Sequence, residues 1–195
     1  MKRYLTYFGY VCRHKLWVAI AGLKLGVSWW RLLKHDWHKF LPSEFGPYAR
    51  TFYNPDGSKK PYHATNEFRM AWNFHQKRAD HHWQHHLKFG PGICGNSRPL
   101  GTCPAGSDDI LIWDRGTAEC LKCGSNVAIE EFTAMEMPSE AVREMVADWY
   151  GAGRAITGRW DAREWYEKNA DIIKLHTNTK ALVLLNFRVH NSEFK

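Results

Sequence analysis

Residues 90–136 separate two helix-like parts of the chain and resemble neither of them. The segment is rich in Gly, Pro and Cys and carries short strand-like pieces, "DILIW" and "NVAIEEF". Long amphipathic helices do not form in such a sequence, because Gly and Pro interrupt them. On both sides, apolar residues recur at helical spacing. We therefore expect a mainly α fold, in which residues 1–89 and 137–195 form a helical domain and 90–136 form an insertion.

Five helices are expected from the apolar spacing and from the residues that usually begin or end helices. Gly26 is expected to stop the first, Pro42 to follow the second, and Gly151 and Gly153 to end the fourth. The fourth begins at Pro138 and Ser139, a pair that favours a helix start. The expected ranges are 3–25, about 28–39, 65–87, 138 to about 151–153, and a last helix from about 178.

The composition indicates a basic protein whose core contains many large aromatic side chains. The chain has 195 residues, a formal net charge of +7, 14% aromatic residues and ten Trp. A basic surface favours anionic partners such as phosphates, nucleotides or nucleic acid, although many basic proteins bind none of these. No segment approaches the roughly 18–20 uninterrupted apolar residues of a membrane span. We expect a cytoplasmic protein without membrane contact, and leave homo-oligomerisation open.

The cysteines of the insertion are spaced as metal ligands. The ending "CLKCG" places two thiols three residues apart before a Gly, which suits one tetrahedral ion, whereas the first pair is nine residues apart. We expect a structural zinc ion that stabilises a segment too short for a core of its own, with a redox C-x-x-C or unliganded thiols as the alternative. The four ligands would be Cys94, Cys103, Cys120 and Cys123. Cys12, the fifth cysteine, is expected to be buried in the first helix.

The histidines of the expected third helix fall partly on one face. At about 100° per residue, His75, His82 and His86 lie within about 40° of one another, while His81 points away. Aligned imidazoles suit a transition-metal site, but a solvated polar face gives the same pattern. Glu144 and Asp148 likewise share one face of the fourth helix, where a solvent-facing acidic stripe is the simpler interpretation.

The order of these residues along the chain favours a metal site over separate surface features. It resembles the HD-domain superfamily of metal-dependent phosphohydrolases, in which a helical bundle collects one His, an adjacent His-Asp pair, further His and a distant Asp around one or two divalent metals. The corresponding residues here are His14, His35-Asp36, His75 with His81 and His82, and Asp148. The resemblance implies an HD-domain-like bundle.

A second resemblance covers most of the chain. The phrases "HKLWV", "HDWHKFLPSEFGPYARTFY", "AWNFHQKRADHHWQHH" and "MPSEAVREMVADWYGAGRA" resemble a family of small phage and bacterial proteins of unknown function. Its pattern reads H-K, H-D-x-S-K-F-x-x-E-F, A-W-x-x-H, H-H-W and E-M-x-x-D-W. His38 stands where that pattern usually has Ser. If the chain is phage-encoded, the expected location is the host cytoplasm.

The HD-domain resemblance implies a division of roles. His14, His35, Asp36 and Asp148 would hold the principal ion, and His75 and His82 would serve a second ion or the substrate. The ion would be Mn, Fe, Co, Ni, Zn or Mg, and it would activate water for attack on phosphorus. Asp36, Glu144 and Lys39 would act in catalysis, with Glu144 either accepting a proton or orienting a ligand. The phosphate-binding candidates are Lys39, Arg50, Lys77, Arg78 and Arg154, although a surface position without that role is the simpler interpretation of each.

Two functions compete on these grounds. The first is a divalent-metal-dependent phosphohydrolase that acts on a nucleotide or related phosphoester. The second is a non-catalytic, zinc-stabilised module that binds nucleic acid or a host protein, in a phage accessory or counter-defence role. The recurrence of His, Asp and Glu on helices far apart in the chain favours the enzyme, since a nucleic-acid binder gains nothing evident from carboxylates among its histidines.

Overall fold

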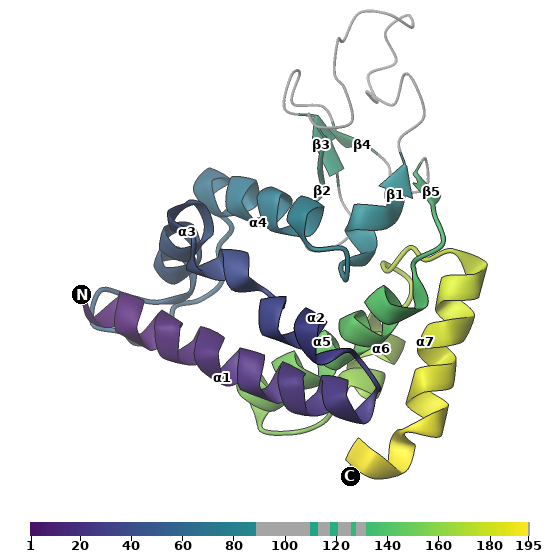
Figure 1. Ribbon diagram of the computed structural model, residues 1–195. Coiled ribbons are helices and arrows are strands. Elements are labelled where there is room, and N and C mark those ends of the chain that lie inside the picture. The colour runs from purple at the N-terminus through teal and green to yellow at the C-terminus, as the bar shows by residue number, and fades with distance from the viewer. Residues whose placement is uncertain (89–109, 113–117, 121–125, 128–131, 195) are drawn as a thin grey trace, which may run out of the picture.

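A computed structural model describes residues 1–88, 110–112, 118–120, 126–127 and 132–194 (Figure 1). The described part is mainly helical, as expected. Its α-helices are α1 Lys2–Lys24, α2 Trp29–Lys34, α3 Pro42–Phe52, α4 Asn66–Arg78, α5 Ser139–Thr157, α6 Ala162–Asn169 and α7 Thr177–Val189. Three 3-10 helices follow α2, α4 and α7: η1 Trp37–Phe40, η2 Trp83–His86 and η5 Asn191–Phe194.

Helix α1 carries a buried stripe along its whole length. Tyr7, Val11, His14, Val18 and Ala21 are buried at spacings of three and four residues, which is the apolar face of an amphipathic helix. His14 is the polar member of this stripe. It lies between Val11, which belongs to one hydrophobic cluster, and Val18, which belongs to another. The position therefore places one imidazole between two apolar regions.

The two clusters occupy opposite ends of α1. Tyr7 and Val11 pack with residues of α3 and α4, including Tyr48 and Phe68. The larger cluster joins the second half of α1 to α5, α6 and α7. Figure 1 shows α3 beside the N-terminal half of α1, α4 beyond α3, and α7 beside the C-terminal end of α1. The polar residues of the candidate site lie where these two groups of helices meet.

Helices α1 and α5 cross at a glycine. A Cβ atom added to Gly151 would lie 2.6 Å from the backbone nitrogen of Val18 and 2.8 Å from its Cα. The expectation that Gly151 and Gly153 end this helix is wrong, because α5 continues to Thr157 and ends at Gly158, whose φ is 78°. Gly151 instead allows the close approach of the two helices, one turn from both His14 and Asp148.

The chain breaks its helix at the His35-Asp36 pair. Instead of one helix over 28–39, α2 ends at Lys34 and η1 begins at Trp37. Asp36 has φ 52° and ψ 23°, and it is the non-glycine residue with positive φ in the described ranges. Aspartate tolerates this left-handed conformation better than most residues, and such backbone tends to occur at functional sites. The break lets adjacent side chains point into the same region.

The third helix is shorter than the histidine periodicity predicts. Helix α4 ends at Arg78, and Ala79 has the extended angles φ −109° and ψ 103°. The angular relation deduced for His81 therefore does not hold beyond Arg78. Two expectations for the other helices also fail: α6 forms over a stretch in which no helix was expected, and Cys12 is exposed.

The described strands are short and antiparallel. β1 Leu87–Lys88 pairs with β5 Thr133–Ala134, and β2 Ile110–Ile112, β3 Ala118–Cys120 and β4 Asn126–Val127 form a second sheet in the order β2-β3-β4. β2 and β4 lie within the expected strand pieces, residues 109–113 and 126–132, and β4 covers only the first two residues of the second. Cys120 is buried in β3, whereas Cys94, Cys103 and Cys123 lie outside the described residues, so the zinc expectation stays a prediction. Within the described ranges, no helix has both the length and the apolar character to cross a bilayer.

Candidate metal centre

Seven side chains converge into two groups of potential metal ligands that share Asp36. In the first group, His14, His35, Asp36 and Asp148 each offer one atom, and these atoms lie within 4.8 Å of one another. In the second group, the same is true of Asp36, His75, His81 and His82. The residues come from α1, α5, the break after α2, the end of α4 and the turn that follows it.

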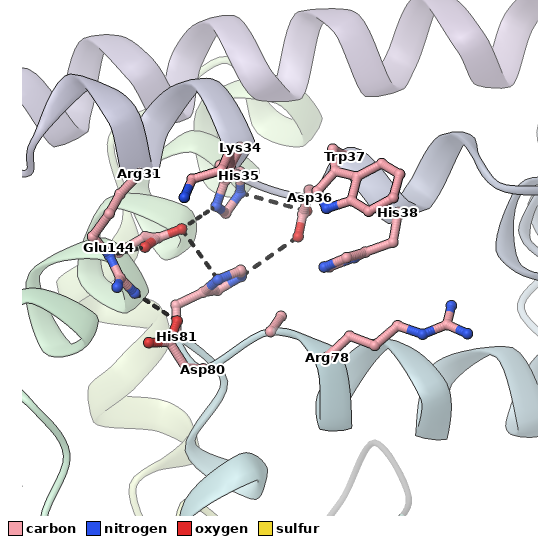
Figure 2. A pocket seen from close by; sticks show the side chains of 11 residues that line it. Arg31, Lys34, His35, Asp36, Trp37, His38, Arg78, Asp80, His81 and Glu144 are labelled. Carbon is pink, nitrogen blue, oxygen red and sulfur yellow. Dashed lines mark hydrogen bonds and ion pairs between the residues drawn. The ribbon is translucent and has the colours of Figure 1, made fainter.

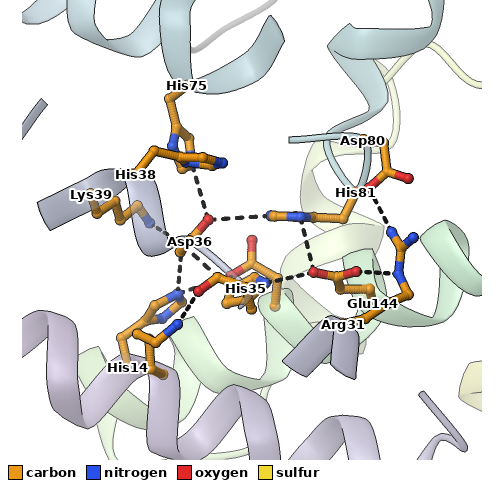
Figure 3. Close-up of polar contacts among 12 residues, drawn as sticks. His14, Arg31, His35, Asp36, His38, Lys39, His75, Asp80, His81 and Glu144 are labelled. Carbon is orange, nitrogen blue, oxygen red and sulfur yellow. Dashed lines mark hydrogen bonds and ion pairs between the residues drawn. The ribbon is translucent and has the colours of Figure 1, made fainter. Parts of the chain in front are cut away.

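The two oxygens of Asp36 face different groups. Oδ2 lies 3.3 Å from Nε2 of His14 and 3.4 Å from Nε2 of His35. Oδ1 lies 3.3 Å from Nε2 of His75 and 3.5 Å from Nε2 of His81 (Figure 3). One carboxylate thus stands between two sets of imidazoles, which is the arrangement by which an aspartate bridges two ions.

The spacing of the donor atoms fits a metal ion better than hydrogen bonds. Bond lengths of about 2.0–2.1 Å put neighbouring ligand atoms about 3.0 Å apart in an octahedral site and about 3.4 Å apart in a tetrahedral one. The histidine-to-carboxylate separations run from 3.1 Å, between His14 Nε2 and Asp148 Oδ1, to 3.5 Å, and all donor atoms of a group lie within 4.8 Å of one another. The distances are therefore those expected around a common centre.

The same donor atoms lack satisfactory hydrogen bonds. The Nε2 atoms of all five ligand histidines, both oxygens of Asp36 and Oδ1 of Asp148 are buried and find no hydrogen-bond partner of good geometry among the described residues. Buried polar groups are nearly always paired, because leaving one unpaired costs about 1–3 kcal/mol. Apart from Asp36 Oδ2, which also meets the Lys39 ammonium at 2.5 Å, these atoms in two tight groups are what the chain would offer to two cations.

Two glutamates contact the other ring nitrogen of three of the five ligand histidines. Oε1 of Glu144 lies 2.9 Å from Nδ1 of His35 and 3.2 Å from Nδ1 of His81. Oε2 of Glu44 lies 3.0 Å from Nδ1 of His75. A carboxylate that accepts the Nδ1 proton turns Nε2 toward the ligand position and increases its basicity. Both carboxylates are therefore placed to orient imidazoles.

Arginines hold these glutamates in turn. Arg31 donates from Nε to Oε2 of Glu144 at 2.6 Å and from Nη2 to Asp80 at 2.5 Å. Arg78 donates to Oε1 of Glu44 at 2.9 Å. The result is a chain of contacts from surface arginine to buried carboxylate to imidazole.

Two effects compete at the charged groups of the cluster: burial disfavours their charged forms, and attraction between unlike charges favours them. Burial disfavours the charged form of His81, but its close contacts with the carboxylates of Asp36 and Glu144 outweigh burial and raise its pKa to about 10. Burial also opposes the charge of Asp36, yet His35 and Lys39 hold its pKa well below the ordinary value. For His75, burial dominates and lowers its pKa well below the ordinary range.

These shifts predict a stability maximum near pH 6.5 for protein stripped of metal. The pKa values of His35 and His81 are raised above 6.5, that of His81 to about 10, so the stability these two histidines contribute is complete below pH 6.5 and is lost as pH rises above it. The pKa values of His75 and His82 are lowered, so the folded state loses stability as pH falls below 6.5. We expect the melting temperature to fall by about 4 °C, or roughly 1–2 kcal/mol, between pH 6.5 and 10.

Thermal denaturation from pH 4 to 10, with and without added Mn²⁺ or Zn²⁺, measures this effect. Metals displace protons from their ligands, so the increase in melting temperature on adding metal should be larger at pH 9 than at pH 6. A melting temperature that rises steadily from pH 6.5 to 10 in the stripped protein would contradict the assigned charges.

A pocket of about 220 Å³ opens beside this cluster (Figure 2). Its walls include His35, Asp36 and His81, so it reaches residues of both groups, and Arg31, Lys34 and Arg78 bring positive charge to it. The indole of Trp37, 53% exposed, also lines it. His38, where the resembling pattern has Ser, lines the pocket with its Nδ1 3.9 Å from Glu44.

The expected phosphate-binding residues lie in different places. Arg78 lines the pocket. Lys39 is instead a neighbour of Asp36, with Nζ 2.5 Å from Oδ2, and this contact outweighs burial to raise its pKa. Arg50 pairs with Glu67 at the surface. Arg154 stacks over Trp17 and Trp160. Lys77 is half-buried and does not line the pocket.

The sequence alone assigns no site role to three residues of the cluster. His81 is excluded by the assumption that α4 continues, and Glu44 and Arg31 receive no role. The signal that could have recovered His81 is the Ala79-Asp80 pair, because Asp is a weak helix former. His86, grouped with His75 by helical spacing, instead contacts the carbonyl of Asp80 at 2.7 Å.

Comparison with known proteins identifies a family without assigning an activity. No curated protein and no solved structure matches the chain. A family profile described as "Family of unknown function (DUF5662)" matches residues 3–101. That stretch carries every His and Asp of the two ligand groups except Asp148, together with Glu44 and Arg31. Since the match covers half of the chain, this protein belongs to the DUF5662 family of unknown function.

Proposed function

We propose that this protein is a divalent-metal-dependent phosphohydrolase that acts on a nucleotide or a related phosphoester. The observation that carries the proposal is the pair of four-donor groups joined by the two oxygens of Asp36. Two ions bridged by one carboxylate suit phosphoryl transfer, because together they can neutralise the attacking and the leaving oxygens. The order of the donors along the chain resembles that of HD-domain phosphohydrolases.

The donor chemistry favours a transition metal. The second group offers three imidazoles and one carboxylate oxygen, and the first offers two of each. Imidazole suits Mn, Fe, Co, Ni and Zn, whereas Mg prefers oxygen ligands and retained water. When bound, such ions supply an activated water nucleophile and stabilise negative charge on the phosphoryl group.

In this proposal Glu144 is a positioning residue and not the proton acceptor. Its Oε1 contacts two imidazoles and its Oε2 contacts Arg31. Burial opposes its charge, but the contacts with His35 and His81 hold its pKa below the ordinary value. Oε1 is thus placed to orient two ligand imidazoles while Arg31 holds Oε2, which corresponds to the second of the two roles expected from the sequence.

The substrate would enter through the 220 Å³ pocket. Lys34 is exposed at its edge and Trp37 offers a large flat surface, so an anionic phosphate and a planar base would each find a complementary side chain. Arg31 and Arg78 add positive charge while remaining bound to Glu144 and Glu44.

The test is phosphate release from a panel of nucleotides and cyclic dinucleotides with Mn²⁺, Co²⁺, Ni²⁺ or Mg²⁺. We expect turnover with at least one metal. For the best substrate, Lys34→Gln should raise KM about tenfold with metal content unchanged, because one charge-assisted contact is lost. Lys168→Gln, an exposed lysine of α6, is the matched control. Metal-loaded protein that releases no phosphate across the panel would refute the enzymatic function.

A second candidate is the non-catalytic binding module. The observation that favours it is the exposure of Trp29, Trp30 and Leu33 on α2, at 59%, 56% and 60%. Tryptophan is enriched at protein interfaces. Salt-dependent retention on DNA without hydrolysis, or a complex with a host protein that Trp30→Glu abolishes, would favour this function.

A further inference from the structure

A second cavity, of about 260 Å³, lies apart from the pocket at the metal centre and shares none of its lining residues. Helix α1 contributes Tyr10 and Arg13, the end of α3 and the chain after it contribute four residues, and the last turns of α5 contribute two. The remaining lining residues are Phe52, Tyr53, Lys59, Lys60, Ala155 and Ile156.

The charge of this cavity is positive and uncompensated. Arg13, Lys59 and Lys60 line it, and no carboxylate does. Among the described residues, none of these three cations is paired with a carboxylate, whereas Arg31 and Arg78 of the other pocket each hold a glutamate. Lys60 donates to the carbonyl of Arg50 at 3.1 Å, which fixes its position without neutralising it. An anion is the complementary occupant.

The walls of the cavity are flat and apolar. Tyr10, Phe52 and Tyr53 present three aromatic rings, and Ile156, 56% exposed, stands at the edge. Arg13 lies over the Tyr10 ring at 6.0 Å from its centroid. Aromatic rings beside cations accept a planar ring that carries a negative group, because the ring stacks while the anion meets the cations.

The cavity is held open by local structure. Tyr53 and Lys59 form an antiparallel bridge, and the nitrogen of Lys60 donates to the carbonyl of Phe52 at 3.0 Å. Gly57, with φ 89°, lies at the tip of this turn, and a Cβ there would approach the hydroxyl of Thr6 to 2.7 Å. The turn is therefore packed on α1, which fixes the two lysines before a ligand arrives.

We propose that this cavity binds a nucleoside monophosphate, at a site distinct from the metal centre. Three cations suit a phosphate dianion better than a single carboxylate, and the aromatic walls suit the base. The volume lies just below the roughly 300 Å³ at which the usual range of ligand pockets begins, so one mononucleotide is the upper limit of size. This inference goes beyond the proposed hydrolysis, since the bound nucleotide is not cleaved there.

The site adjoins the metal centre through one side chain. The Tyr10 ring that lines the cavity also stacks on the imidazole of His14, with centroids 6.1 Å apart and planes at 17°. His14 is a member of the first ligand group. A nucleotide against Tyr10 therefore restrains the ring that packs on a candidate metal ligand.

Calorimetric titration of the full-length protein with the phosphonate analogue of AMP tests the proposal. In this analogue a methylene replaces the bridging oxygen, so hydrolysis cannot occur. We expect saturable binding that Arg13→Gln weakens about tenfold through loss of one charge-assisted contact. Ile156→Glu, which brings negative charge to the edge of the cavity, should weaken it as well. Adenosine should bind more weakly than the phosphonate.

Two variants separate this site from the metal centre. Arg163→Gln removes an exposed cation of α6 and should leave binding unchanged. Lys34→Gln, which should weaken nucleotide binding at the metal centre, should leave unchanged the separate binding event that Arg13→Gln weakens. Affinity that falls with Lys34→Gln but not with Arg13→Gln would place the nucleotide at the metal centre, which overturns this inference while leaving the proposed hydrolysis intact. Failure of the phosphonate to bind wild type would also overturn it.

Discussion

Replacing Asp36 by Asn should remove both metal ions and lower phosphoester hydrolysis by about 10³-fold or more. Each oxygen of Asp36 faces a different ligand group, so the loss of one carboxylate affects both. Asparagine is the appropriate replacement, because it tolerates the left-handed backbone of Asp36, φ 52°, about as well as aspartate does. An alanine variant would add backbone strain to the chemical change.

Metal content by mass spectrometry, measured with circular dichroism to verify folding, checks this result. Relative to wild type, Asp36→Asn should lose about two ions per chain, whereas His14→Ala and His82→Ala, each confined to one group, should lose about one. Any zinc bound at the predicted cysteine site is present in wild type and variants alike, so it does not affect the difference in metal content between them. Asp56→Asn, an exposed aspartate in a surface turn, is the control and should lose none. Equal metal content in wild type and Asp36→Asn would exclude the bridged centre.

Replacing Gly151 by Ala should destabilise the protein by about 1–3 kcal/mol. The new methyl group would meet the backbone of Val18 at 2.6–2.8 Å, and backbone cannot rotate away as a flexible side chain can. Helices α1 and α5 must therefore separate. His14 and Asp148, each one turn from the contact, would move apart from 3.1 Å. We expect the first ligand group to lose its ion together with the stability.

Gly9→Ala is the matched control for this experiment. Gly9 also lies inside α1, but a Cβ there meets nothing within 4 Å. Alanine should stabilise the helix by about 0.5–1 kcal/mol, since glycine loses more backbone freedom on folding. Urea denaturation of the two variants should thus give changes of opposite sign. A stabilised Gly151→Ala would show that the two helices are not in close contact.

The helical periodicity of the sequence predicts a substantial part of the fold. Helix α1 lies within a residue of the expected range, α5 starts where Pro138 and Ser139 indicate, and α7 begins at Thr177. These elements are predictable because capping residues and apolar spacing act within a few residues of one another. The sequence alone does not predict that α5 continues through Gly151, because a glycine in a helical pattern usually indicates a helix end. Only the close contact with Val18 of α1 explains a glycine inside the helix.

The candidate ligands were predictable by type and order, but their grouping was not. His14, His35, Asp36, His75, His82 and Asp148 stand out in the chain, and the structure brings all of them together. His81 was excluded because the histidine spacing was extended past the true end of α4. That end coincides with tertiary contacts: Asp80 meets Arg31 of α2, and His81 meets Glu144 of α5.

Local patterns in the sequence indicate most of the helices and the polar residues that interrupt their apolar faces, but they place the His-Asp pair inside a helix over 28–39. The left-handed backbone of Asp36, the different histidines that its two oxygens face, and the contacts by which Glu44 and Glu144 orient histidines arise only when the helices pack. These two kinds of feature depend on interactions of different range along the chain. Helix formation depends on neighbours within one or two turns, whereas the distance between His14 and Asp148 depends on how closely two helices pack, which Gly151 and Val18 set from opposite parts of the chain.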